Sequence, residues 1–96
     1  MDPDVRVTAT PAGSGWSCEV VVRDGRSETV HRVGVSRGDL ERLAPGATDP
    51  TELVRASFAF LLEREPKESI LRSFDLPVIA RYFPEYDRDI ARRMRR

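Results

Sequence analysis

The segment from Phe58 to Tyr86 constrains the fold more than any other part of this chain. It holds six of the seven aromatic residues, namely Phe58, Phe60, Phe74, Tyr82, Phe83 and Tyr86. Three prolines, Pro66, Pro77 and Pro84, interrupt it. Proline is tolerated in the first turn of a helix but breaks a helix interior. The segment therefore predicts short helices that pack around aromatic side chains.

The length and composition of the chain indicate one small globular domain. Its 96 residues suffice for a single modest core, and 40% of them are hydrophobic while 33% are charged. This balance is typical of globular rather than disordered proteins. The 16 basic and 16 acidic residues cancel, so the net charge gives no general attraction to nucleic acid or to anionic membranes.

Cysteine usage and hydropathy favour a cytoplasmic protein. Cys18 is the only cysteine, so no intramolecular disulfide can form, which fits a reducing compartment. The first residues, MDPDVRV, contain no apolar run, and we expect no signal peptide. No stretch approaches the ~20 apolar residues of a membrane-spanning helix, and we expect no membrane partner. Lys67 is the only lysine, which we interpret as the codon usage of a GC-rich bacterial genome.

Alternating residues predict three β-strands in the N-terminal half. Residues 5–9 alternate between apolar and polar, a PAGSG loop occupies 11–15, and residues 16–23 alternate again. Asp24-Gly25 is a strong hairpin signal, because these residues tolerate the positive φ of a tight turn. Residues 28–35 then form the third strand.

A two-residue turn at Asp24-Gly25 determines which residues face each other across the hairpin. It pairs Arg23 with Arg26 and Cys18 with His31, and a one-residue slip would misalign the apolar faces. A thiol beside an imidazole is the start of a nucleophile–base pair, but no orienting third residue accompanies it. One cysteine and one histidine cannot complete a zinc site. We therefore expect both side chains in the core, with no metal and no cofactor.

Capping residues and prolines divide the C-terminal half into short helices. Ser36 and Asp39 form a capping-box pattern that predicts a first short helix. Asp49, Pro50 and Glu52 predict the start of the main helix, which carries the broad apolar stripe of a helix packed on a sheet. The main helix is expected to run to about residue 64, and later helices are expected over 66–73, 78–82 and 84–94.

These elements predict an α+β fold, in which a three-stranded antiparallel β-meander packs on one main α-helix and short proline-punctuated C-terminal helices follow. Residues 1–4 are expected to form an N-terminal tail, 5–87 a single domain, and 88–96 an arginine-rich helix end or tail. The expected core comprises Trp16, Cys18, Val20, Val33, Val35, Leu53, Phe58, Leu61, Ile70, Phe74 and Ile79.

The segment Phe58–Tyr86 also resembles a motif at the C-terminus of short, uncharacterised bacterial proteins. The resemblance rests on the ending FLLEREPKESILRSFDLPVIARYFPEY and covers about a third of the chain. The preceding strands are compatible with it in length and pattern. The resemblance implies a small α+β domain, and it implies no activity, cofactor or catalytic residue.

The aromatic residues favour a non-enzymatic protein-interaction or regulatory module. Aromatic side chains are enriched at the centres of interfaces. The residues expected to bind a partner are Phe60, Tyr82, Phe83 and Tyr86. The alternative is that these rings form the second half of the core. The partner is an unidentified protein, or a second copy of the chain paired through an open sheet edge.

Nucleic-acid binding is the second hypothesis. Residues 69–86 have the outline of a helix-turn-helix, and the candidate phosphate contacts are Arg88, Arg92, Arg95 and Arg96. Against this, the acidic residues at 85, 87 and 89 would face the phosphates, and Pro84 interrupts the recognition helix. Strands followed by helices also resemble an antitoxin-like regulator of the HicB type, although that family places a helix after its first strand.

We do not expect an enzyme. The candidates Glu63, Glu65 and Glu68 lie in a mixed-charge run, which is typical of a solvated ionic face. Paired carboxylates for acid–base catalysis need one raised pKa in an apolar cleft.

Overall fold

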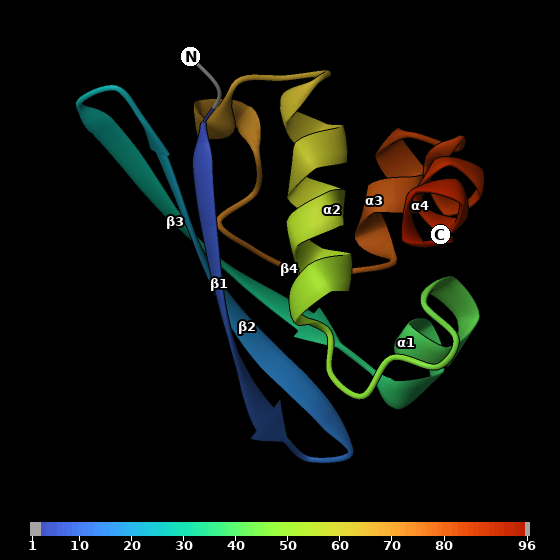
Figure 1. Cartoon of the computed structure of the whole chain (residues 1–96). Helices are drawn as coiled ribbons and strands as arrows, with labels where there is room; N and C mark the ends of the chain where they lie inside the picture. The colour runs from blue at the N-terminus through green and yellow to red at the C-terminus, as the bar shows by residue number, and fades with distance from the viewer. Residues whose placement is uncertain (1–2, 96) are drawn as a thin grey trace.

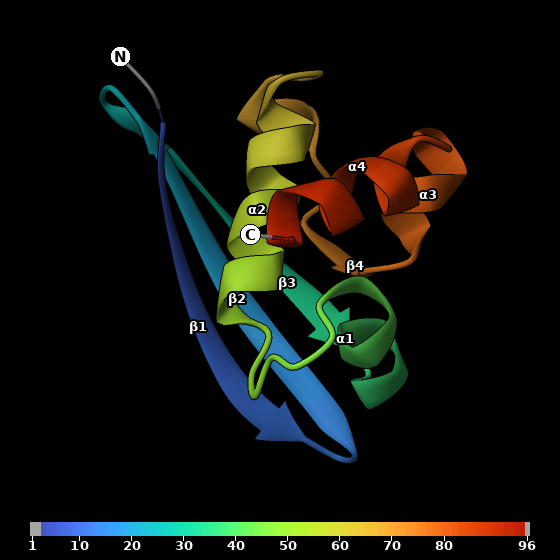
Figure 2. The same cartoon turned by 45° about the vertical axis from the view of Figure 1, so that its right-hand side comes forward.

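The computed structural model describes residues 3–95, which form a four-stranded sheet with the helices gathered on one of its faces (Figures 1 and 2). The sheet order is β1-β2-β3-β4, in which β1 to β3 are antiparallel neighbours and β4 runs parallel to β3. The strands are β1 Asp4–Ala12, β2 Gly15–Asp24, β3 Ser27–Val35 and β4 Ser73–Asp75. The helices are α1 Arg37–Leu43, α2 Thr51–Leu62, the 3-10 turn η1 Lys67–Ser69, α3 Val78–Tyr82 and α4 Tyr86–Met94. The α+β class is confirmed. The expected three-stranded antiparallel meander is matched only in part, because β1 to β3 belong to a four-stranded mixed sheet that β4 completes.

The hairpin turn lies one residue later than predicted. Its central residues are Gly25 and Arg26, and of these only Gly25 has a positive φ, of 65°, as in a type II′ turn. The register therefore shifts by two residues, and Cys18 faces Val33 instead of His31. A shift of two preserves the faces of a strand, so the predicted inner face is right although the predicted pairs are wrong.

Charge explains the choice of register. The predicted turn would have placed Arg23 opposite Arg26, whereas the observed turn places Arg23 opposite Glu28. The guanidinium of Arg23 lies 2.9 Å from the Glu28 carboxylate. Opposite charges directly across a strand pair stabilise it and like charges destabilise it.

The predicted helix over 66–73 is wrong. Only Lys67–Ser69 forms a helical turn, and the chain then becomes extended and adds β4 beside β3. The Arg32 amide donates to the Arg72 carbonyl at 2.8 Å, and the Leu76 amide donates to the Gly34 carbonyl at 2.9 Å. Without this strand, the edge of β3 would expose unpaired backbone groups. Pairing with β3 thus overrides the local helical pattern.

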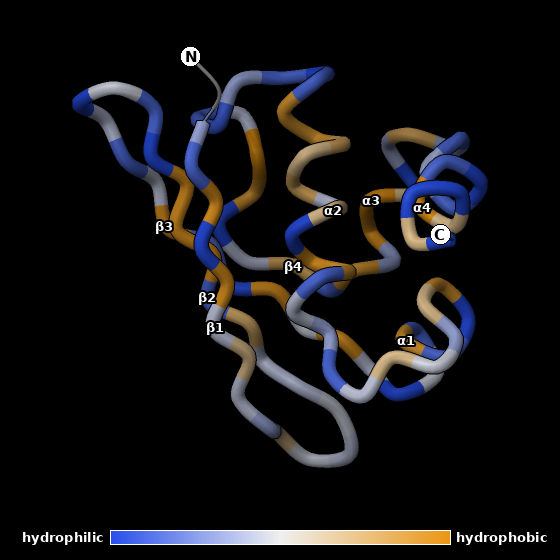
Figure 3. Tube along the Cα trace, viewed as in Figure 1, coloured by the Kyte–Doolittle hydropathy of each residue, from blue (hydrophilic) through white to orange (hydrophobic). Residues whose placement is uncertain are grey.

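The core lies between the inner face of the sheet and α2. Nine of the eleven predicted core residues are buried, whereas Trp16 and Phe74 are only half-buried. The apolar stretches of the strands and of α2 and α3 meet between the two layers (Figure 3). Helix α4 runs across the predicted boundary after residue 87, and its Ile90 is buried in the same core. Met1 and Asp2 of the predicted tail lie outside the described residues.

The predicted helix starts are mostly observed. Ser36 and Asp39 form the capping box, with both hydrogen bonds at 3.0 Å. The start of α2 lies one residue later than predicted, since Pro50 is the N-cap and carries no side-chain cap, while the preceding Asp49 carboxylate accepts the Thr51 amide at 2.8 Å. Glu52 does not complete a second capping box, because it pairs with Arg55 on the helix surface.

Candidate interaction groove

An apolar groove opens on the surface between the end of α2, the segment from η1 to β4, and α3. Its cavity volume is about 190 Å³. Leu71, Phe74, Val78, Tyr82 and Phe83 contribute much of its apolar lining, and Glu65 lies among them. Two rim side chains are well exposed, since Leu71 shows 46% and Tyr82 66% of its surface to solvent.

One wall of the groove is held to the sheet by His31. The His31 Nδ1 lies 2.8 Å from the Leu71 carbonyl oxygen, which only accepts, so Nδ1 carries the proton and donates. Its Nε2 then accepts from the Thr29 hydroxyl, also at 2.8 Å. Burial lowers the pKa of His31, opposed by the Leu71 hydrogen bond and reinforced by the positive charge of Arg72. A neutral imidazole thus fixes the backbone of Leu71.

The other wall is held to α2 by a buried aromatic cluster. Phe60 contacts Tyr86 and Phe83 edge-to-face, with ring centroids 5.3 and 5.9 Å away. The Ser57 hydroxyl donates to the Leu53 carbonyl at 2.8 Å and accepts from the Tyr86 hydroxyl at 2.6 Å. Burial raises the pKa of Tyr86 above its usual range, so the phenol stays protonated.

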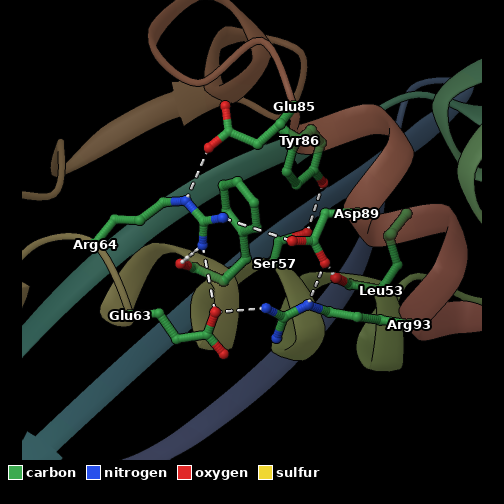
Figure 4. A network of polar contacts seen from close by, with 9 residues as sticks. Leu53, Ser57, Glu63, Arg64, Glu85, Tyr86, Asp89 and Arg93 are labelled. Carbon is green, nitrogen blue, oxygen red and sulfur yellow. Dashed lines mark hydrogen bonds and ion pairs between the residues drawn. The ribbon is translucent and has the colours of Figure 1, made fainter.

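Two arginines close the α2–α4 contact with ion pairs (Figure 4). The Arg64 guanidinium carbon lies 3.6 Å from the Phe60 ring centroid, and its nitrogens reach Glu85 at 3.1 Å and Asp89 at 3.5 Å. Arg93 pairs with Glu63 at 2.6 Å and with Asp89 at 2.9 Å. Hydrogen bonds from Arg93 lower the pKa of both the Glu63 and Asp89 carboxyls. We call these five residues, together with Phe60 and Tyr86, the α2–α4 clamp.

Glu65 differs from the carboxylates of the clamp. Within residues 3–95 its side chain has no ion pair and no side-chain hydrogen bond. Burial against the groove raises its pKa. Raising the pKa of a carboxyl is the effect of removing it from water without supplying a cation. Among residues 3–95, Glu65 is therefore a carboxylate without a cation partner beside an apolar surface.

The four predicted partner-binding residues are not brought together on the surface. Phe60 and Tyr86 are fully buried, Phe83 is half-buried and Tyr82 is exposed. Only Tyr82 and Phe83 line the groove, together with Leu71, Phe74 and Glu65, which the sequence analysis did not select as partner-binding. The signal that could have found Phe74 is the alternation over 73–76, where Phe74 is half-buried and Leu76 buried while Ser73 and Asp75 are exposed.

The predicted phosphate contacts lie on the outer side of α4. Arg88, Arg92 and Arg95 are exposed, and the structure pairs none of them with a carboxylate among the described residues. Arg96 lies outside the described residues. The acidic residues of α4 are occupied elsewhere, since Asp87 pairs with Arg42 at 2.7 Å and Asp89 belongs to the clamp.

Cys18 and His31 do not form the nucleophile–base pair considered from the sequence. Cys18 is fully buried opposite Val33, and burial raises the pKa of its thiol to about 11. Both ring nitrogens of His31 are occupied by Thr29 and Leu71. In the described part of the chain, no three His, Cys, Asp or Glu residues lie close enough to hold a metal ion. No helix there is both long and apolar enough to span a bilayer.

Comparison with protein-family models, curated proteins and solved structures found no match to this chain.

Proposed function

We propose that this chain is a non-enzymatic protein-interaction module that binds a segment of a partner protein in the groove. The observation that carries the proposal is the clustering of exposed apolar surface. Of the three large hydrophobic side chains exposed in residues 3–95, two, Leu71 and Tyr82, stand on the rim of one apolar groove. Isolated exposed apolar residues are ordinary, but contiguous ones around a cavity mark binding sites.

The surroundings of the groove suit binding by a preformed surface. One wall is fixed to β3 through His31 and the backbone pairing of β4, and the other is fixed to α2 through the clamp. A preformed groove loses little conformational entropy when it binds, which favours affinity. Catalysis would need a second titratable group beside Glu65, but Glu63 and Glu68 are paired with Arg93 and Lys67.

Selection from a random peptide library on the immobilised full-length chain tests the proposal. Leu71→Asp should weaken the selected peptides at least about tenfold, because it places a charge where an interface buries an apolar side chain. Val30→Asp is the matched control, since Val30 is 43% exposed and lies on β3, away from the groove. Peptides that ignore Leu71→Asp, or a selection that enriches no sequence, would contradict the proposal.

Nucleic-acid binding by an antitoxin-like regulator remains a second candidate, on one specific observation. The acidic residues that argued against it form ion pairs with arginines elsewhere in the chain. Arg88, Arg92 and Arg95 remain exposed on one side of α4. Three phosphate contacts to duplex DNA give a slope of about −2.7 for log K against log salt. Titration of the chain and of its Arg88→Gln, Arg92→Gln, Arg95→Gln triple variant with a DNA duplex at several salt concentrations tests this. An equal slope for both proteins would exclude these arginines as the contact.

A further inference from the structure

We infer, on the basis of the proposed function, that the partner segment inserts one aromatic side chain into the groove and places an adjacent lysine or arginine against Glu65. Three features of the molecule support this: the size of the groove, the lack of a partner for Glu65 among the described residues, and the contrast between Glu65 and its neighbouring glutamates.

The size of the groove suits one ring. An apolar cavity of about 150 Å³ is large enough to hold benzene, and the groove measures about 190 Å³. Phe74 and Phe83 line it and are themselves only half-buried, so an inserted ring finds aromatic faces and edges to contact. Tyr82 on the rim covers such a ring from the solvent side in the manner of residues that exclude water around an interface anchor.

Glu65 makes the groove selective for a positively charged partner segment. Glu65 is one of the residues that line the groove, and its side chain is already partly removed from water. A partner that covers the groove removes the remaining water, and an ionised carboxylate without a counter-charge is strongly unfavourable in such a site. A cation on the partner satisfies the carboxylate, whereas a neutral segment leaves it unpaired and an acidic segment repels it. Glu65 therefore discriminates between partners by penalising the wrong ones.

The neighbouring glutamates in this segment differ from Glu65, because each of them is paired. Glu63, two residues earlier, pairs with Arg93 at 2.6 Å, and Glu68, three residues later, pairs with Lys67 at 2.7 Å. The pKa of both is lowered, by the Arg93 and Lys67 hydrogen bonds respectively, while that of Glu65 is raised by burial. Arg64 adjoins Glu65 in sequence, yet its guanidinium lies over the Phe60 ring and pairs with Glu85 and Asp89, as the ion pairs in Figure 4 show. The fold thus leaves this carboxylate for a cation from outside.

Three small probes with the same ring isolate the charge preference. Phenethylamine, 2-phenylethanol and 3-phenylpropionate share a phenyl group and a two-carbon arm, and they carry a positive, neutral and negative head group at pH 7. Each is titrated into the full-length ¹⁵N-labelled chain, and the amide shifts of groove residues such as Leu71 and Phe74 give the dissociation constants. We expect phenethylamine to bind about 3- to 10-fold more tightly than 2-phenylethanol, and 3-phenylpropionate to bind most weakly.

Two variants show whether Glu65 causes the preference. Glu65→Gln keeps the shape of the side chain and removes its charge, so the amine and the alcohol should then bind equally. Glu68→Gln is the matched control and should retain the preference of the wild-type chain, because Glu68 is paired with Lys67. Persistence of the preference in Glu65→Gln would overturn the inference.

The outcomes also separate this inference from the proposed function. If the three probes shift the groove amides equally, the groove accepts rings without charge selection, so the inference fails while the interaction module stands. If no probe shifts these amides, the inference fails as well, and the peptide selection with Leu71→Asp decides the proposed function independently. Enrichment of an aromatic residue next to lysine or arginine among the selected peptides would support the inference a second time.

Discussion

The α2–α4 clamp and the groove beside α3 use the same residue types to opposite effect. In the clamp, rings are buried against one another and each acidic group has a cation within 3.5 Å. In the groove, rings are partly exposed and the carboxylate of Glu65 has no cation in the described structure. Both regions meet at the last turn of α2. Residue composition alone therefore does not distinguish a structural contact from a binding site, whereas the presence or absence of a partner for each polar group does.

The clamp is expected to act mainly through geometry and burial. Exposed ion pairs each contribute about 0–1 kcal/mol, so the arginines add less than the rings they cover. Their value lies in holding α4 and thereby Phe83, which forms part of the groove wall. The clamp thus serves the groove by keeping its wall in place.

The largest expected effect distinguishes two aromatics that the sequence placed in one group. Phe60→Ala should lower the free energy of unfolding by about 3–5 kcal/mol, because the ring is fully buried and its removal leaves a cavity. Tyr82→Ala should change it by less than about 0.5 kcal/mol, because that side chain is 66% exposed. Urea unfolding followed by circular dichroism measures both. Equal losses of unfolding free energy in the two variants would contradict the distinction between a buried clamp residue and an exposed groove residue.

A smaller effect is expected from the single hydroxyl in the clamp. Tyr86→Phe removes the hydrogen bond to Ser57 and should lower the free energy of unfolding by about 1 kcal/mol. Ser57 keeps its bond to the Leu53 carbonyl, so no buried donor is left unsatisfied. The same urea experiment measures it. A neutral result would show that the Tyr86 ring alone positions α4.

Acid should weaken the groove wall before it weakens the clamp. The folded state lowers the pKa of His31 below its ordinary value of 6.5, so the unfolded chain takes up the proton first as pH falls. Stability should be full above about pH 6.5 and should decrease from there toward the folded pKa. The carboxylates of the clamp have lowered pKa values and matter only in more acidic solution.

Unfolding of the wild type and His31→Asn between pH 5 and 7.5 measures this decrease. The variant should be less stable at pH 7.5, because it loses packing against Phe58, 5.2 Å away between centroids. Its stability should nevertheless stay level over this range. A decrease of equal size in both proteins would assign the titration to another group.

The parts of this fold that could be predicted are those that depend on neighbours in sequence. Alternation placed Cys18 and Val20 on the inner face, and the Asp49-Pro50 signal placed the start of α2 to within one residue. The register was wrong because alternation is unchanged by a shift of two residues, whereas the Arg23–Glu28 pair favours the observed one. Strand β4 was missed because three residues become a strand only through pairing with β3.

The groove could not be predicted for a related reason. Tyr82 and Tyr86 are four residues apart, which in one continuous helix would place both on the same face. The break at Phe83-Pro84 was predicted and puts them in separate helices, but it does not show how these helices pack, with one ring in the core and the other on the rim. The lack of a partner for Glu65 depends likewise on where Arg64 is directed, which is a property of the packed helices.

The smallest expected effect compares two glutamates at either side of Arg64. The folded state raises the pKa of Glu65 above its ordinary 4.5, so ionised Glu65 disfavours folding, and Glu65→Gln should slightly stabilise the chain at pH 7. The folded state lowers the pKa of Glu63, so Glu63→Gln should slightly destabilise it at the same pH. Both differences should disappear as pH falls below the relevant pKa values, because the wild-type carboxyls are then neutral too. Unfolding at pH 7 and at successively lower pH measures them, and differences of the same sign at pH 7 would show that Glu65 already has a partner within the chain.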